Sequence, residues 1–212
     1  MSLNNLELHK LESYKTLEGV YLNSFFLKRD YLNYLIFPPG HVALFKDFFL
    51  AKGGVGKQII TSPDQINLGC AQTFKTFGAA AVLLKEGHIG QIFPKDLETL
   101  RVELWGNDFF DKDINFEAFE KTCLNWFIIN HKGKNLLITD EKVIMNHQGW
   151  KHNPRYPITH SDKLLLEDFA QNDFVRKFKI DYLIPRCHTG EFYLQKISAD
   201  SFKENIYNLI SI

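Results

Sequence analysis

The stretch IITSPDQINLGCAQTFKTFGAAAVLLKEG, Ile59 to Gly87, decides the fold of this 212-residue chain. Its pattern predicts a short buried strand at its start, a helix over Asn67–Phe77 and a second buried strand over Ala79–Leu84. The turn between the first strand and the helix reads TSPDQ, Thr61 to Gln65. Layered α/β proteins place their chemistry at such strand ends, so the stretch predicts both a fold class and a candidate site.

The segment before this stretch is predicted to form strands and one helix. Within residues 19–37, two apolar runs of high β-strand propensity flank the polar residues Lys28-Arg29-Asp30. This pattern is typical of two strands joined by a turn. Pro38-Pro39-Gly40 ends the second run. Residues 42–49 then space their apolar side chains for one helical face, and Gly53-Gly54 ends that helix.

A hairpin is the strongest signal in the second half. The sequence WFIINHKGKNLLITD, Trp126 to Asp140, contains two apolar runs joined by a polar turn with a glycine. Residues 141–161 contain two prolines and three histidines and are expected to be irregular. Ser161 is then expected to cap a helix through Phe178, with a break near Asn172 as the alternative.

The chain ends with the short strand DYLIP, the loop RCHTG and a helix over residues 198–210. Each half of the chain therefore opens with antiparallel strands and then alternates strands with helices. This order predicts an α/β fold, a four-layer αββα sandwich in which two sheets pack face to face with helices outside. Residues 1–212 are expected to form one domain.

Composition excludes several classes of protein. Hydrophobic residues make up 45% and charged residues 24%, as in a globular chain, and the formal net charge is zero. A zero net charge gives no long-range attraction to nucleic acid or to anionic membranes. The three cysteines form no CxxC pair and the N-terminus has no apolar signal segment, so we expect a reduced, cytoplasmic protein.

The glycine-rich sequence GGVGKQ, residues 53–58, is predicted to be a turn and not a phosphate-binding loop. A phosphate loop needs Gly-x4-Gly-Lys-Ser/Thr before a helix, so that the helix N-terminal amides face the phosphates. Here the spacing differs, Gln58 replaces the hydroxyl residue, and a strand follows.

Asp64, Asp140 and His188 are the main candidate site residues, because each follows the end of an apolar strand. Two carboxylates and an imidazole that meet at one edge of a sheet would hold a divalent metal and activate a water. Structural roles are open for each of them. Asp64 would cap the helix near Asn67, Asp140 would end the hairpin, and His188 would bond to backbone.

Two other groups carry weaker signals. His147, His152 and His160 are spaced by five and eight residues, which matches no helical or hairpin ligand geometry. Cys187 beside His188 suggests a thiol nucleophile, but neighbours in a strand-like loop point in opposite directions. A surface lobe and a structural thiol are the alternatives.

With these residues in view, the chain resembles the metallo-β-lactamase fold superfamily. The resemblance covers residues 19–210 and rests on the order of parts: YLIFPPG, a helix, IITSPDQ, a helix, AAAVLLKE, WFIINHKGKNLLITD, a loop, a helix and DYLIPRCHTG. Family members carry a His-x-His-x-Asp-His loop, a histidine before the hairpin, a Gly-Asp pair after it and a Gly-His in the last loop.

Carried over residue by residue, this resemblance implies a degenerate metal site. Asp64 matches the family's loop aspartate, and Gln65 stands where the loop's last histidine would be. Asp140 matches the bridging carboxylate and His188 the last ligand, whereas the region of Thr122 lacks the expected histidine. The implied ligands Asp64, Asp140, His188 and Gln65 would serve at most one divalent ion (zinc, manganese or iron), or none.

Two functions follow from the resemblance. The first is a divergent, metal-dependent hydrolase of small esters, thioesters or phosphoesters, with a bound water as nucleophile. The second is a non-catalytic binding or interaction module on the same scaffold. This function is suggested by the absence of the histidines that form the family's first metal position. The expected partners are a small molecule and, through residues 141–161 with Trp150 and Tyr156, a second copy of the chain, with no nucleic acid and no membrane.

Overall fold

The computed structural model describes residues 3–84, 100–106, 111–116, 119, 124–146, 148–156, 158–191 and 195–211. The chain divides into two compact units that alternate along the sequence. We call Ser2–Ser13 with Asn23–Asp111 the N-terminal unit, and Tyr14–Leu22 with Lys112–Ile212 the C-terminal unit. The single domain expected from the sequence stays a prediction.

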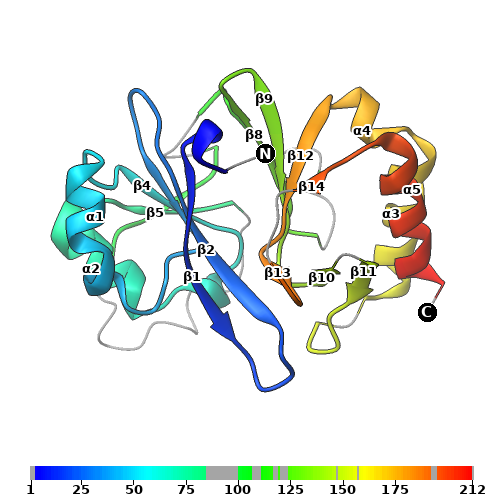
Figure 1. Ribbon diagram of the computed structural model, residues 1–212, viewed down its shortest axis with the longest axis horizontal. Helices are drawn as coiled ribbons and strands as arrows, with labels where there is room; N and C mark the ends of the chain where they lie inside the picture. Colours follow the sequence, from blue (N-terminus) through cyan, green and yellow to red (C-terminus); the bar gives the residue numbers. More distant parts are fainter. Residues whose placement is uncertain are drawn as a thin grey trace. The chain divides into compact units, whose positions relative to one another are not determined.

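The described helices and strands follow the α/β order expected from the sequence (Figure 1). The helices are η1 (Leu3–Leu6), η2 (Val42–Phe45), α1 (Lys46–Ala51), η3 (Pro63–Gln65), α2 (Leu68–Phe77), α3 (His160–Gln171), α4 (Phe174–Lys177) and α5 (Ala199–Ile210). The strands up to residue 104 are β1 (Leu8–Lys15), β2 (Tyr21–Leu27), β3 (Tyr34–Ile36), β4 (Lys57–Ile60), β5 (Ala81–Leu83) and β6 (Val102–Leu104). The later strands are β7 (Ile114–Asn115), β8 (Phe127–His131), β9 (Lys134–Ile138), β10 (Val143–Asn146), β11 (Gly149–His152), β12 (Ile180–Ile184), β13 (Cys187–His188) and β14 (Gln195–Lys196).

In the N-terminal unit, β3, β4, β5 and β6 pair in parallel, and β2 runs antiparallel to β3. The central strands are largely buried: β3 and β5 have no exposed residue, and β4 contributes the buried Ile59 and Ile60, as expected where both faces of a sheet are covered. Phe49 of α1 packs on Phe26 of β2, and Cys70 of α2 lies in one cluster with Ile60 of β4. These contacts hold the opening stretch as a strand, a helix and a parallel strand.

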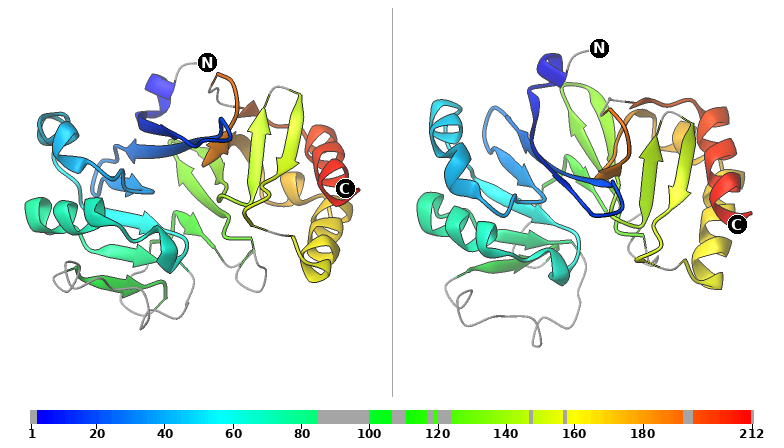
Figure 2. Two further views of the ribbon diagram at one scale, coloured as in Figure 1. Left: turned by 90° about the horizontal axis from the view of Figure 1, so that it is seen from below. Right: turned by 60° about the horizontal axis from the view of Figure 1, so that its bottom comes forward.

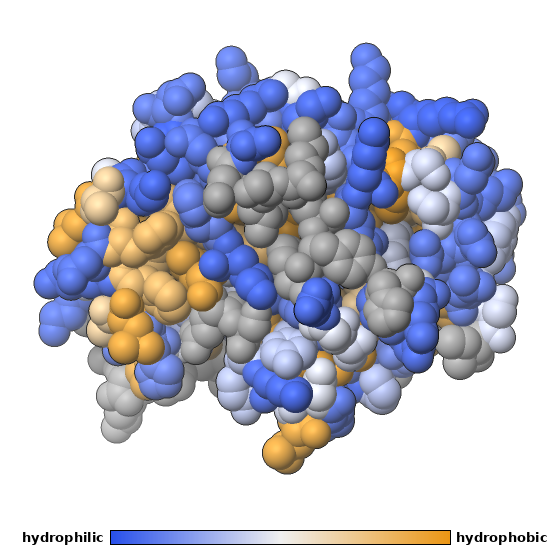
Figure 3. Space-filling view, in the orientation of Figure 1, coloured by the Kyte–Doolittle hydropathy of each residue, from blue (hydrophilic) through white to orange (hydrophobic). Residues whose placement is uncertain are grey.

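The helical side of the N-terminal unit also presents apolar side chains to solvent. Leu44 of η2 is 78% exposed and Leu50 of α1 is 56% exposed. Figure 3 shows apolar atoms gathered over the helices at the left of the view.

In the C-terminal unit, one sheet has the strand order β14-β12-β9-β8-β7. Strand β10 pairs with β11 and β13, and β13 continues to Tyr21 and Leu22 of β2. Helix α5 covers β11 (Figure 2). At this contact the ring centroids of Trp150 and Phe202 lie 5.4 Å apart. Among the described residues, none of the helices has the length and apolarity to cross a bilayer.

Several local predictions are confirmed. The hairpin β8–β9 forms at the expected turn, where Lys132 (φ +50°) and Gly133 (φ +69°) both adopt positive φ, as a two-residue turn requires. The helix predicted over Asn67–Phe77 is present as α2, and its cap is Asn67, which accepts from the Cys70 N–H at 3.1 Å, where the sequence suggested Asp64. The helix predicted over residues 198–210 is present as α5, and its cap, which was not predicted, is Ser198.

Two local predictions were wrong. The helix after residue 158 is capped by Thr159 and not by Ser161, because Thr159 forms a reciprocal capping box with Asp162. Residues 141–161 are not irregular throughout, since they contain the hairpin β10–β11. Gly149, at φ +133°, begins β11 in a backbone conformation that L side chains rarely adopt, and this turn was not recognised in the sequence.

Candidate functional site

Asp140 follows β9 and its carboxylate is bonded within the C-terminal unit. The carboxylate is 2% exposed, and its Oδ1 accepts from Trp126 Nε1 at 3.2 Å and from the Lys142 N–H at 3.0 Å. Its Oδ2 accepts from the Asn125 N–H at 2.9 Å. Three of the four lone-pair positions of the carboxylate are therefore used by the protein itself.

Burial raises the pKa of Asp140 above its ordinary value, and the N–H donors of Asn125 and Lys142 partly offset that rise. All three hydrogen-bonding groups are donors, and donors favour the ionised carboxylate. The geometry is that of a carboxylate that ties the start of β8 to the segment after β9. This agrees with the structural role considered for Asp140, which ends the hairpin.

His188 lies on β13, 4% exposed, in the same unit as Asp140. Its ring stacks on Tyr21 with the centroids 5.1 Å apart and the planes at 13°. Strand β13 pairs with β10 through Met145 and with β2 through Tyr21, and these two ladders fix the position of the imidazole.

Gln65 and Asp64 belong to η3 of the N-terminal unit. The Gln65 Oε1 accepts from the Thr61 N–H at 2.9 Å and from the Thr61 hydroxyl at 3.1 Å, so its amide oxygen closes the turn after β4. The side chain of Asp64 lies outside the described part of the structure. Its predicted role as the cap of α2 is filled by Asn67.

These contacts bear on whether the predicted ligands fit a metal ion. Both lone-pair positions of the Gln65 amide oxygen and most of those on Asp140 accept hydrogen bonds from the protein. In the part of the chain that the structure describes, no group of three His, Cys, Asp or Glu side chains is placed to hold a metal. The described oxygen atoms of Asp140 and Gln65 are thus largely engaged by the protein, and ligation by Asp64, Asp140, His188 and Gln65 stays a prediction.

The weaker candidates have structural contacts. His152 Nε2 lies 2.6 Å from the Tyr156 carbonyl oxygen, and His160 is exposed at the start of α3. His147 lies outside the described residues, as does Thr122. Cys187 is fully buried and burial raises the pKa of its thiol, which keeps it protonated and unreactive.

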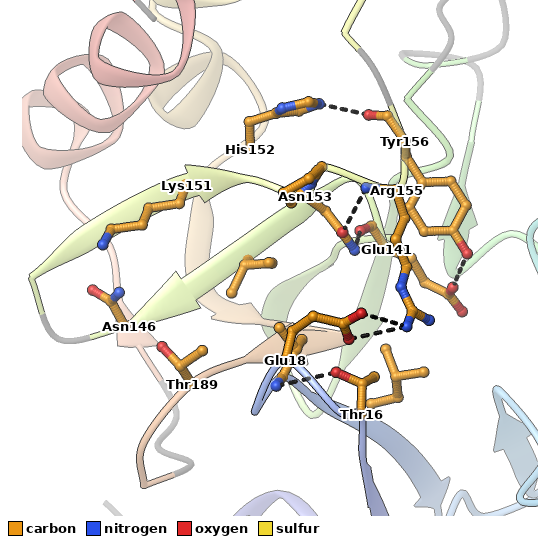
Figure 4. A pocket seen from close by; sticks show the side chains of 14 residues that line it. Thr16, Glu18, Glu141, Asn146, Lys151, His152, Asn153, Arg155, Tyr156 and Thr189 are labelled. Atoms are coloured by element: carbon orange, nitrogen blue, oxygen red, sulfur yellow. Dashed lines mark hydrogen bonds and ion pairs between the residues drawn. The ribbon is translucent and has the colours of Figure 1, made fainter.

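A pocket of about 490 Å³ lies within the C-terminal unit. It is lined by the segment around Thr16–Leu22, by β10 and β11, by the loop Asn153–Tyr156 and by Thr189 (Figure 4). Its volume is in the range of small-molecule sites. Two lining residues, Glu141 and Thr189, directly follow the predicted ligands Asp140 and His188.

Several polar side chains that line the pocket form ion pairs and hydrogen bonds. Arg155 Nη2 contacts both carboxylate oxygens of Glu18, at 2.8 and 2.9 Å. Glu141 accepts from the Tyr156 hydroxyl at 2.6 Å and pairs with Arg186 at 3.3 Å. The sequence pointed to Tyr156 as a loop residue of interest, but it did not predict the pocket. The segment Thr16–Leu22 carries no chemical motif, and it lies far in sequence from the other residues that line the pocket.

No protein-family model and no curated protein matches the sequence. Solved structures do match its fold. The metallo-β-lactamase DIM-1, from a crystal exposed to ceftazidime, is 11% identical, with 95% of this chain and 92% of that chain covered and a TM-score of 0.58.

Two further structures match over similar lengths. A metallo-β-lactamase from Hirschia baltica is 12% identical, covering 94% of this chain and 97% of that chain with a TM-score of 0.51. A putative metallo-β-lactamase from Thermotoga maritima is 14% identical, covering 90% and 99% with a TM-score of 0.52. Identities this low carry the fold and no activity. The chain therefore has the metallo-β-lactamase fold, in a divergent form, as the order of its elements predicts.

Proposed function

We propose that this protein is a non-catalytic module that binds a small molecule on the metallo-β-lactamase scaffold. The observation that carries this proposal is the bonding of Asp140, whose buried carboxylate accepts three hydrogen bonds from Asn125, Trp126 and Lys142. The bonding of the Gln65 amide oxygen to Thr61 supports it. Both side chains hold turns together at positions where the fold's enzymes would place ligands.

A single-metal hydrolase of small esters, thioesters or phosphoesters is the competing function. The similarity to structures named as metallo-β-lactamases favours it. It requires Asp140 to exchange protein donors for an ion while remaining buried. Breaking these hydrogen bonds leaves N–H groups unsatisfied, at a cost of about 1–3 kcal/mol each. This cost would weaken the affinity of the site for the ion.

Metal analysis of the wild-type protein separates the two functions. The protein is purified without chelator from cells supplied with Zn²⁺ or Mn²⁺ and then analysed for metal and assayed on p-nitrophenyl acetate and p-nitrophenyl phosphate. We expect far less than one ion per chain and no hydrolysis above that of heat-denatured protein. One ion per chain that is lost in Asp64→Ala but kept in Asp47→Ala, an exposed aspartate of α1, would overturn the proposal.

A further inference from the structure

The pocket of the C-terminal unit has an apolar floor. Val20, Leu22 and Ile144 line it, and the same residues pack with Cys187 in one cluster. Val20 is 8% exposed and Ile144 is 7% exposed, so the floor is fixed by the core and does not need a ligand to form. A preformed apolar surface of this kind favours a ligand with an apolar body.

Polar groups stand at two ends of this floor. Figure 4 shows Glu18 and Arg155 towards one end, and Lys151, Asn146 and Thr189 towards the other. The two ends differ in how their charges are compensated. Glu18 is paired with Arg155, and the nearby Glu141 is paired with Arg186.

Lys151 brings a positive charge to the lining of the pocket. No ion pair involves its ammonium group in the part of the chain that the structure describes, and its side chain is exposed on β11. An amide side chain, Asn146, and a hydroxyl, Thr189, lie at the same end. These groups together match an acceptor with a single negative charge, whereas a dianion such as a phosphate monoester would leave one charge unmatched.

We propose that the pocket binds an amphipathic monocarboxylate, with its carboxylate at Lys151, Asn146 and Thr189 and its apolar chain on Val20, Leu22 and Ile144. This inference rests on the proposed function and names the ligand class of that module. The Glu18–Arg155 pair closes the far wall. Since that pair is more than half exposed, it contributes little to stability and serves mainly to shape the pocket.

Lys151 also has a purely structural explanation, because an exposed lysine on a strand such as β11 discourages pairing with other chains. A structural lysine would affect solubility and association but would not distinguish a charged ligand from its neutral analogue. The test therefore compares two probes of equal chain length, decanoate and decanol.

Binding of both probes is measured by titration calorimetry on the full chain, as wild type, as Lys151→Met and as Lys196→Met. Lys196 is an exposed lysine of β14 that does not line the pocket, so its variant carries the same change in net charge. We expect Lys151→Met to weaken decanoate binding about tenfold and to leave decanol binding within about twofold, and Lys196→Met to change neither.

A second variant, Ile144→Phe, fills the floor and is expected to abolish binding of both probes. Its thermal unfolding is followed in parallel, so that a failure to fold is recognised. Decanoate binding unchanged by Lys151→Met would overturn the assignment of the carboxylate end, and failure of both probes to bind the wild type would overturn the ligand class. Both results are independent of the metal and hydrolysis measurements that test the proposed function, so a failure of one proposal can be told from a failure of the other.

Discussion

The indole Nε1 of Trp126 donates a hydrogen bond of 3.2 Å to the carboxylate of Asp140, and both side chains are buried. The donor lies at the start of the hairpin and the acceptor directly after it. The carboxylate thus closes the β8–β9 hairpin at its open end, opposite the Lys132-Gly133 turn.

We expect Asp140→Ala to lower the free energy of unfolding by about 3 kcal/mol, because the buried indole N–H of Trp126 and the part-buried N–H groups of Asn125 and Lys142 lose their acceptor. Urea unfolding followed by tryptophan fluorescence measures this. Asp200→Ala, at an exposed position in the first turn of α5, serves as the control and should cost less than about 1 kcal/mol. The loss in Asp140→Ala should be the same with and without added Zn²⁺; a loss seen only with the ion would mark a ligand instead.

Gly69 is expected to be irreplaceable in α2. A Cβ at this position would lie 1.8 Å from the Pro39 carbonyl oxygen, which is backbone and cannot move cheaply. We expect Gly69→Ala to destabilise the protein by about 2 kcal/mol, although alanine is the better helix former by about 1 kcal/mol.

Chemical denaturation of Gly69→Ala and of Ala71→Gly, two residues further along α2, checks this close approach. Ala71→Gly should cost about 1 kcal/mol through helix propensity, with a further small loss from the contact of its methyl group with the Ile60–Cys70 cluster. If Gly69→Ala were more stable than the wild type, α2 would not lie against the Pro39 backbone.

His9 should make the stability depend on pH. Burial lowers the pKa of His9 from its ordinary value of 6.5, the charges of Lys52 and Lys28 add to the decrease, and the charge of Glu7 opposes it. The unfolded chain therefore binds this proton more readily than the folded one. Stability is fully present above pH 6.5 and falls as the pH drops through 6.5 towards the lowered pKa.

We expect His9→Phe to remove the contribution of His9 to the loss of stability at low pH. Phenylalanine does not titrate, and its ring extends the cluster with Phe26 and Phe48. Urea midpoints at pH 5, 6, 7 and 8 measure the slope. His160→Gln, at an exposed position, should keep the wild-type slope. Equal slopes in the wild type and in His9→Phe would show that other groups cause the dependence.

Local signals were sufficient for much of the fold. The turn at Lys132-Gly133 and the helices that begin near Asn67 and Ser198 each depend on a short local pattern, and each is confirmed. The similarity to metallo-β-lactamase structures likewise follows from the order of the elements.

The site depended on contacts that no local pattern encodes. Asp140 was interpreted as a strand-end carboxylate, but its bonding is set by Asn125 and Trp126, which precede the hairpin. The pocket combines Thr16–Leu22 with residues more than a hundred positions later, and such a pairing has no signature in one sequence. The hairpin β10–β11 was missed because its strands are only four residues long each, too short for a clear alternating pattern.

The pairing of Tyr21 and Leu22 with β13 has a consequence for biosynthesis. Residues 21 and 22 are synthesised well before β13, so one edge of this segment must wait for that later strand before its backbone is satisfied. Until then it is an open strand edge in a nascent chain, and such edges are where chains associate wrongly. Pairing over so long a sequence separation is expected to form slowly, which lengthens the time for which this edge is exposed.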